Sequence, residues 1–310
     1  MRLFIAGDTH GNNSFWDWYL LPRAKLHAAD RIVQCGDFGF WEHAPSGVEY
    51  LDLLEQSAAE ADLTIYALHG NHDNWSLVMQ RYGTDRDDEG FVRVRPHIRY
   101  IPQGHVWTWE GTRMRAFGGA YSIDKQWRLD LEAKRNRQAL AVEEHRRSAG
   151  RKPKPVIDHT GTVWFPDEEM TDAEFTELMI ADCQVLDVVF SHDRPRRAGC
   201  GLDLKNEPLC LPNQDRLDLA LAAHRPQWWF HGHLHHSYKD RVDVGDTVTT
   251  IVGLACDDKA AMRFWRPWHS WCALDIVEGS PPTYYASHVL DEAVATKKAR
   301  AAAHSTEGEH

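Results

Sequence analysis

Five short apolar runs in the chain each end in a cluster of polar residues that can bind metal. The runs read LFIA, RIVQC, LTIYAL, VLDVVF and QWWF, and their length and their branched and aromatic content predict buried strands. In α/β folds, ligands collect outside the carboxyl ends of the strands. The polar clusters are therefore expected to meet at one mouth of a sheet. Their candidate metal ligands are Asp8, His10, Asp37, Asn71, His192, His233 and His235.

The donor set of this mouth suits a pair of divalent cations. It offers carboxylate, imidazole and amide oxygen but no thiolate, which favours manganese, iron, zinc or cobalt over a soft-metal site. Two cations about 3.5–4 Å apart can clamp the attacking and leaving oxygens of a displacement at phosphorus. A water held between them ionises near neutral pH and replaces a side-chain nucleophile. We expect two divalent metal ions as cofactors, with Mn²⁺ the first choice in vitro and Fe, Zn or Co as alternatives.

The ordered clusters resemble the signature of the calcineurin-like metallophosphoesterases, which reads D-x-H, G-D, G-N-H-[DE], H and G-H-x-H. The chain carries every element, as GDTHG, GD, GNHD, SHD and GHLH, and the resemblance spans roughly residues 1–290. It implies that His72 stands beside the substrate, that Asp73 orients it, and that Asp37 bridges the two metals. The implied ligand sets are Asp8, His10 and His235 for one metal, and Asn71, His192 and His233 for the other.

His72 is the candidate general acid for the leaving oxygen. An unperturbed histidine titrates at about pH 6.5, and a carboxylate beside it, here Asp73, would keep the ring oriented and protonated. The alternative is a histidine at the start of a helix whose ring only bonds a carboxylate. The sequence leaves both interpretations open.

Length and composition fit one globular domain of an α/β enzyme. The 310 residues are 43% hydrophobic, which is enough to bury a large core. The 35 basic residues are outnumbered by 46 acidic ones, and the net charge of −11 argues against an extended nucleic-acid surface. We therefore expect a small phosphoester or nucleotide as the binding partner. The oligomeric state stays open.

The sequence shows no signal for export or for a membrane. The segment MRLFIAGDTHG runs straight into the first strand and the first ligand cluster, so we expect no cleavable leader. No apolar stretch reaches the roughly 20 residues of a membrane-spanning helix. The six cysteines form no C-x-x-C pair, which is typical of reduced thiols. We expect a cytoplasmic protein without membrane contact.

Strand and helix signals alternate in the first part of the chain. Helices near 14–28 and 48–61 between the first three strands predict parallel βαβ units. From Phe91 to Gly118, short strands with turn signals predict a second sheet rich in hairpins. The expected fold is α/β, a four-layer αββα sandwich of two mixed β-sheets flanked by helices, as the resemblance also implies. We expect this domain to cover 1–290, and we expect residues 291–310 to form a helical end that frays into a polar C-terminal tail.

Residues 125–170 interrupt the pattern as an insertion. Within them, residues 128–148 are rich in Glu, Arg, Lys, Gln and Ala and predict a polar helix, and a loop signal starts at Gly150. Just beyond, Thr171 and Glu174 fit a capping box at the start of a further helix. The insertion is either a lid over the substrate or a solvated surface hairpin.

Arginines close to the ligand clusters are candidate phosphate contacts. Arg194 follows His192 closely, and a guanidinium there would fork onto a phosphate, although a surface arginine is the alternative. Tyr121, Lys125 and Arg128 follow a predicted strand, but exposed side chains of this kind are common without a ligand. We therefore retain only Arg194 as a substrate-binding candidate.

The motifs also narrow the class of function. Protein phosphatases of the family carry G-D-x-V-D-R-G where this chain reads GDFGFWE, and its nucleases for DNA breaks add a basic extension that is not evident here. A non-catalytic scaffold would have lost ligands, and none is lost. A hydrolase of phosphoric esters remains, preferably a phosphodiesterase on small or nucleotide-type substrates. The reason for this preference is that no basic cluster is evident beside the ligands to hold a dianionic monoester, and a phosphomonoesterase is the alternative.

Overall fold

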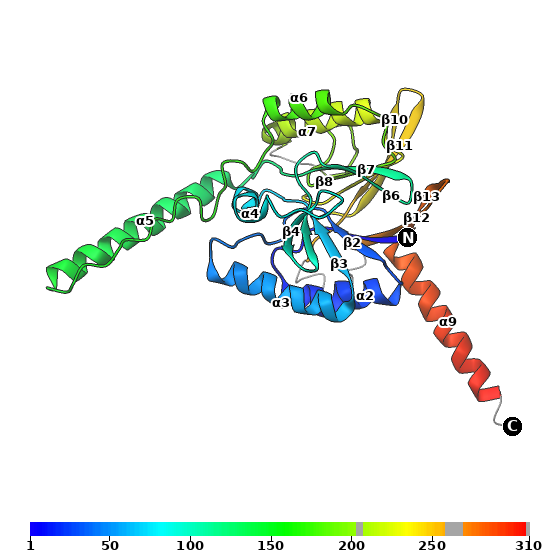
Figure 1. Cartoon of the computed structure of the whole chain (residues 1–310), viewed down its shortest axis with the longest axis horizontal. Coiled ribbons are helices and arrows are strands. Elements are labelled where there is room, and N and C mark those ends of the chain that lie inside the picture. Colours follow the sequence, from blue (N-terminus) through cyan, green and yellow to red (C-terminus); the bar gives the residue numbers. More distant parts are fainter. Residues whose placement is uncertain (203–206, 258–268, 308–310) are drawn as a thin grey trace.

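Two mixed β-sheets pack face to face with helices on their outer faces (Figure 1), in a computed structural model that describes residues 1–202, 207–257 and 269–307. The first sheet has the order β13-β12-β1-β2-β3-β5-β4 and the second β10-β11-β9-β8-β7-β6. The αββα sandwich expected from the sequence is confirmed. The first sheet consists of β1 (Arg2–Ala6), β2 (Arg31–Gln34), β3 (Thr64–Ala67), β4 (Val92–Arg95), β5 (Ile98–Tyr100), β12 (Trp271–Val277) and β13 (Ser280–Ala286). The second consists of β6 (Val106–Trp109), β7 (Thr112–Phe117), β8 (Val188–Ser191), β9 (Trp228–His231), β10 (Tyr238–Val244) and β11 (Thr247–Gly253).

The centre of each sheet is parallel. β1, β2, β3 and β5 run in one direction in the first sheet, and β7, β8, β9 and β11 do so in the second. Hairpins form the edges of the second sheet, and the turn between β6 and β7 has positive φ at both Glu110 and Gly111. That conformation matches the twist of a two-residue hairpin. Parallel and antiparallel pairs together make this a mixed sheet, as expected from the sequence.

Alternate residues of the central strands serve two different cores. Leu3 and Ile5 of β1 pack between the sheets, while Phe4 and Ala6 face the outer helices. This follows from the two-residue period of a strand. Because both faces are buried, the strand reads in the sequence as a continuous apolar run.

The outer helices cover the two remaining faces. Those on the first sheet are α1 (Asn13–Phe15), a π-helical stretch η1 (Trp16–Leu20), α2 (Leu21–Leu26), α3 (Pro45–Ala61) and α4 (Trp75–Tyr82). On the second sheet lie α6 (Asp172–Ala181) and α7 (Glu207–His224). The capping box predicted at Thr171 and Glu174 is confirmed, because each side chain accepts the backbone N–H of the other residue.

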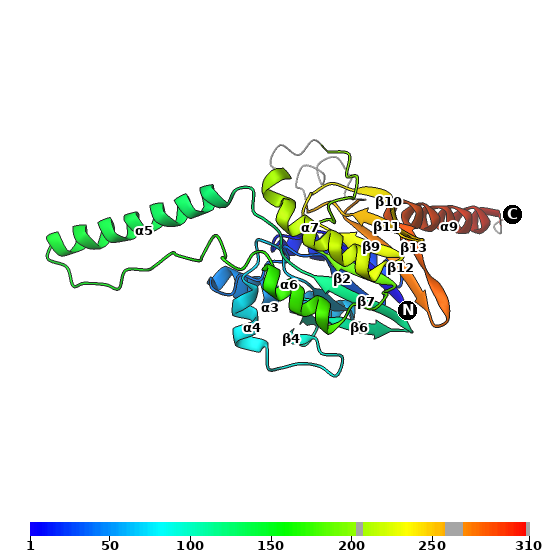
Figure 2. The same ribbon diagram turned by 90° about the horizontal axis from the view of Figure 1, so that it is seen from above.

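The insertion forms an arm that projects from the body of the protein (Figure 2). It consists of the helix α5 (Lys125–Ser148) and an extended return segment, residues 149–163. The helix expected at 128–148 is confirmed and begins three residues earlier. Most of the arm extends away from the sheets, and only its base lies against the body.

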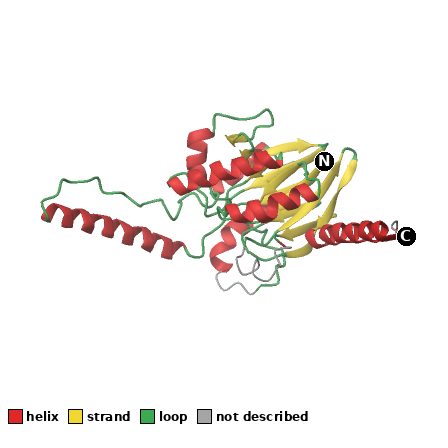
Figure 3. Cartoon of the chain, turned by 90° about the horizontal axis from the view of Figure 1, so that it is seen from below, coloured by secondary structure: helices red, strands yellow, loops and turns green. Residues whose placement is uncertain are grey.

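At the C-terminus, a helical end that frays into a polar tail was expected over 291–310, and the helix found there is longer. The segment forms the helix α9 (Ser287–Glu307), which leaves the body as a single helix (Figure 3). Its content of Ala, Lys, Arg and Glu explains the helix, since these residues have the highest helix propensities. Residues 308–310 of the expected tail lie outside the described residues. Among the described helices, none is long and apolar enough to cross a membrane.

Candidate metal centre

Loops at the carboxyl ends of strands from both sheets converge on one site. Asp8, Asp37 and Asn71 follow β1, β2 and β3 of the first sheet, while His192 and His233 follow β8 and β9 of the second. The first group of candidate metal ligands is compact, with one possible ligand atom of each residue within 4.8 Å of all the others. Its members are Asp8, His10, Asp37 and His235.

The second group meets the first at Asp37. His192 Nε2 lies 3.0 Å from Asn71 Oδ1 and 3.5 Å from Asp37 Oδ1, and the rings of His192 and His233 are 5.0 Å apart. The other oxygen of Asp37, Oδ2, lies 3.6 Å from His10 Nε2. The two oxygens of one carboxylate thus face two different ligand groups, which is the geometry that a bridging ligand requires.

The site concentrates negative charge. Burial alone would raise the pKa of Asp8 and Asp37, but the neighbouring histidines outweigh it, so the pKa of each carboxylate is lowered. Burial would likewise lower the pKa of His10, yet Asp257 and Asp37 raise it to about 11. A proton on such a histidine competes with a metal ion for the same ring nitrogen, because an imidazole must be deprotonated to bind a metal. The donor set therefore fits a pair of divalent ions.

Hydrogen bonds orient the ligand imidazoles. Nδ1 of His192 lies 2.8 Å from the carbonyl oxygen of Cys35, to which it must donate, so Nε2 faces Asp37 and Asn71. Nδ1 of His10 lies 2.8 Å from Asp257 Oδ1, which leaves Nε2 toward Asp37. Such partners fix the tautomer and the direction of a metal-binding histidine. The sequence prediction missed Asp257, although the CDD cluster after β11 repeats the pattern of a polar group at a strand end.

Asp73 does not orient His72, which corrects the expectation from the sequence. Its carboxylate accepts four backbone N–H groups, those of Phe38, Gly39, Phe40 and Gly70, at 2.8–3.0 Å. Burial and the nearby charge of Asp37 raise the pKa of Asp73 to about 6. This residue therefore holds the loop that follows Asp37, and it positions the Asp37 carboxylate instead of the His72 ring.

His72 lies between Asp37 and an arginine of the arm. Its backbone N–H donates to Asp37 Oδ1 at 2.8 Å, and its Nε2 lies 3.7 Å from Asp37 Oδ2. The guanidinium of Arg128 donates to the ring, with Nη2 2.9 Å from Nε2 and also in contact with Nδ1. Burial lowers the pKa of His72 to about 4, with a raising contribution from Asp37 and a lowering one from Arg128. This environment favours a neutral ring, contrary to the expectation that Asp73 keeps it protonated.

Arg194 donates hydrogen bonds within its own loop. Its side chain is only 3% exposed, and Nη1 donates to the carbonyl oxygens of Arg196 and Ala198 at 2.8 and 2.7 Å. The guanidinium thus braces its own loop. In its place the structure brings Arg128 to the site, a residue that the sequence analysis set aside.

A hydrogen-bond relay fixes the amide of Asn71. Its Nδ2 donates to Ser122 Oγ at 2.8 Å, and Ser122 Oγ donates to Glu168 Oε2 at 2.5 Å. The Oδ1 atom of Asn71 is thereby directed toward His192. Glu168 lies in the insertion, so this segment supports a proposed ligand as well as carrying the arm.

At two motif glycines, a side chain would collide with the carboxylate of a candidate ligand, so only glycine fits there. A Cβ on Gly70 would lie 2.0 Å from Asp37 Oδ1, and a Cβ on Gly232 would lie 2.0 Å from Asp8 Oδ1. The backbone is also strained at the ligands themselves, with positive φ, which costs of order 1–3 kcal/mol for each non-glycine residue. The residues are His10 (43°), Asp37 (52°), His233 (63°) and His235 (51°).

Two carboxylates and two imidazoles at the joint of two sheets form a candidate metal site, and the Asn71 amide and the His192 imidazole lie beside it. The family model for calcineurin-like phosphoesterases matches residues 1–237, and the chain belongs to this family. Its members use a dinuclear metal centre and act on phosphoric ester bonds. Among curated proteins, none matches this chain.

Proposed function

We propose that the protein is a dinuclear metal-dependent hydrolase of small or nucleotide-type phosphoesters. The observation that carries this proposal is the position of Asp37, whose two oxygens face the two ligand groups at 3.5 and 3.6 Å. When bound, two divalent ions at such a site polarise the phosphoryl group and supply an ionised water as the nucleophile. Manganese is the ion that we propose to test first, and the cytoplasm is the proposed location.

The side chains of the chain itself would prepare this chemistry. Asp257 and the carbonyl of Cys35 would hold His10 and His192 with Nε2 toward the ions. Asp73 would keep the loop of Asp37 in place through three N–H groups of that loop, so that the bridging carboxylate need not reorganise during the reaction. His72 would stand beside the leaving oxygen as the nearest imidazole outside the ligand sets.

The two ester classes remain distinct candidates. A phosphodiesterase was preferred from the sequence because no basic group was evident beside the ligands. Arg128 is such a group, since it contacts His72, which in turn contacts Asp37. This observation favours the alternative of a phosphomonoesterase, because a second negative charge on the phosphoryl group needs a further cation.

Hydrolysis of a chromogenic bis-aryl phosphate and of an aryl monophosphate tests the proposal. Activity is expected with added Mn²⁺ and is expected to disappear with a chelator. Asp37→Asn should lower the occupancy of the second ion and abolish turnover, because it removes a charge shared by both ions. A chain that binds Mn²⁺ but cleaves neither ester would instead be a non-catalytic scaffold. An Asp37→Asn variant with two ions and normal turnover would show that Asp37 is not the bridge.

A further inference from the structure

We propose that Arg128 binds a non-bridging oxygen of the substrate phosphoryl group and thereby gives the site a preference for phosphomonoesters over phosphodiesters. This inference rests on the proposed function and adds the substrate class. The inference assigns a role to the first turn of α5, which lies close to the proposed metal ligands. Two observations support it: the guanidinium of Arg128 is anchored at two of its nitrogen atoms, and its third nitrogen contacts His72.

The guanidinium is held from two sides. Nε donates to Asp124 Oδ1 at 2.7 Å, and Nη1 donates to the carbonyl oxygen of Val163 at 2.9 Å. The return segment is fixed in turn by Glu132, whose Oε1 accepts three consecutive backbone N–H groups at 2.7–3.0 Å, from residues 162–164. Arg128 is therefore buried and anchored before any substrate arrives, which lowers the entropy cost of binding.

The remaining end of the guanidinium points to the metal centre. Nη2 contacts the ring of His72, and His72 Nε2 lies 3.7 Å from Asp37 Oδ2. One imidazole thus separates the positive charge from the bridging carboxylate. A ring nitrogen that accepts a hydrogen bond from a guanidinium carries no proton of its own, and it is a weaker acceptor than a charged phosphoryl oxygen. We infer that a bound phosphoryl group displaces His72 from Nη2 and leaves the other two contacts intact.

The charge of the ester decides how much this contact contributes. A monoester dianion carries one more negative charge and one more terminal oxygen than a diester. The extra oxygen is an acceptor that a diester replaces with its second ester group. A fixed cation beside the ions therefore stabilises the monoester more than the diester, which is the selectivity that we propose.

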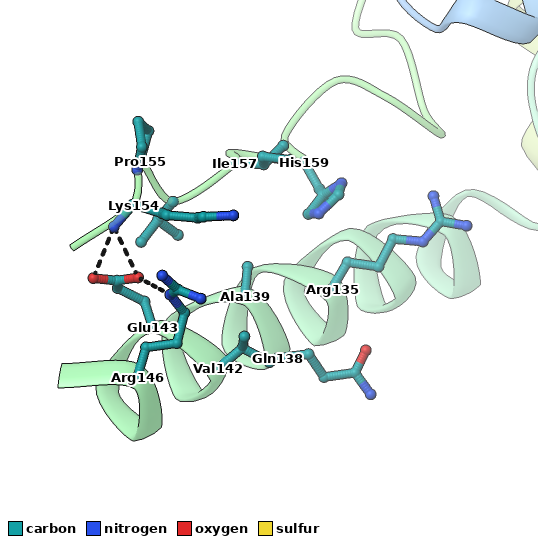
Figure 4. Close-up of a pocket in the computed structure, with 11 residues that line it drawn as sticks. Arg135, Gln138, Ala139, Val142, Glu143, Arg146, Lys154, Pro155, Ile157 and His159 are labelled. Atoms are coloured by element: carbon teal, nitrogen blue, oxygen red, sulfur yellow. Dashed lines mark hydrogen bonds and ion pairs between the residues drawn. The ribbon is translucent and has the colours of Figure 1, made fainter. Parts of the chain in front are cut away.

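The arm offers a matched control. Arg135 lies two turns further along α5, about 10 Å along the helix axis from Arg128. It lines the hollow between α5 and the return segment (Figure 4), away from the ligand groups. A second control, Glu132→Ala, removes the clamp on the return segment without removing a contact to His72. This variant distinguishes the effect of a loosened return segment from the effect of losing the Arg128 guanidinium.

The experiment compares Arg128→Gln, Arg128→Lys, Arg135→Gln and Glu132→Ala on an aryl monophosphate and a bis-aryl phosphate, in the Mn²⁺-loaded full chain. Calorimetry with orthophosphate gives a second readout that needs no turnover. We expect Arg128→Gln to raise KM for the monoester and to weaken orthophosphate binding by about 10- to 100-fold, the effect of one hydrogen bond between charged groups. Diester kinetics should change by less than about threefold, Arg128→Lys should be intermediate, and Arg135→Gln should match the wild type.

Different failures have different meanings. Equal losses on both esters in Arg128→Gln, or unchanged orthophosphate binding, would overturn the role of Arg128 and leave the proposed function standing. The same result follows if Glu132→Ala loses the monoester preference as completely as Arg128→Gln does, because the guanidinium is still present in that variant and Asp124 still holds its Nε atom. A wild-type protein that binds Mn²⁺ and cleaves neither ester would overturn the proposed function together with this inference.

Discussion

Removal of the Asp257 carboxylate should weaken one metal site selectively. Its Oδ1 atom lies 2.8 Å from His10 Nδ1, and its Oδ2 atom accepts from Asn12 Nδ2 at 2.8 Å. Loss of such a partner behind a metal-binding histidine typically lowers metal affinity by about 10- to 100-fold. This corresponds to about 1.4–2.8 kcal/mol, within the range of a hydrogen bond to a charged group. We therefore expect Asp257→Ala to lose this amount at the ion held by His10.

Titration calorimetry with Mn²⁺ would resolve the two ions. The ion that is assigned to Asn71, His192 and His233 should keep its affinity within about threefold, because none of these side chains contacts Asp257 in the described structure. Asp257→Asn should lose less than Asp257→Ala, since an amide oxygen can still accept from His10. The exposed Asp17 provides a control for charge, and Asp17→Asn should leave both affinities unchanged. Equal weakening of both ions, or normal affinity in Asp257→Ala, would refute the assignment of Asp257 to His10.

Three further predictions concern packing and pH. Gly232→Ala should abolish binding of the ion at Asp8 while the purified chain stays folded, because its Cβ would meet the carboxylate; metal analysis showing a full complement would contradict this. Metal affinity should rise with pH, because carboxylates overcome burial and raise the pKa of His10 to about 11, of His235 to about 10 and of His192 to about 9; a flat affinity between pH 6 and 8 in calorimetry would disprove it. Burial, and then Glu168, raise the pKa of Glu169 from 4.5 to about 7, so its stabilising contribution is present below pH 4.5 and is lost as the pH rises through 7. Glu169→Gln should thus gain in unfolding free energy over the wild type across that interval, and a difference independent of pH in urea titrations would exclude this cause.

The convergence of the candidate metal ligands on one site could be predicted because local pattern and fold agree. Each ligand cluster follows an apolar run, and parallel strands place their carboxyl ends at the same edge of a sheet. The αββα architecture followed from the same alternation of strands and helices. The arm helix was predicted from composition, since a run of strong helix formers needs no partner to be recognised.

The partners of these residues could not be predicted, because tertiary contacts decide them. Asp73 is adjacent to His72 in the chain, but its carboxylate lies on the N–H groups of the loop after Asp37. Arg128 is 56 positions from His72 and reaches it only because α5 starts beside the site. Neither arrangement has a periodic or spacing signal. The direction in which the arm leaves the body was open for the same reason.

Each of the two proposed ligand sets draws on both sheets. Asp8 and His10 come from the first sheet and His235 from the second, while Asn71 comes from the first and His192 and His233 come from the second. Bound ions would therefore cross-link the two halves of the sandwich, and their binding free energy would add to the free energy of unfolding. At an ion concentration 100 times the dissociation constant, this linkage contributes about 2.7 kcal/mol for one site. The thermal stability of the protein would therefore depend on the metal concentration around it. Depletion of the metal would lower both the stability and the activity of the protein.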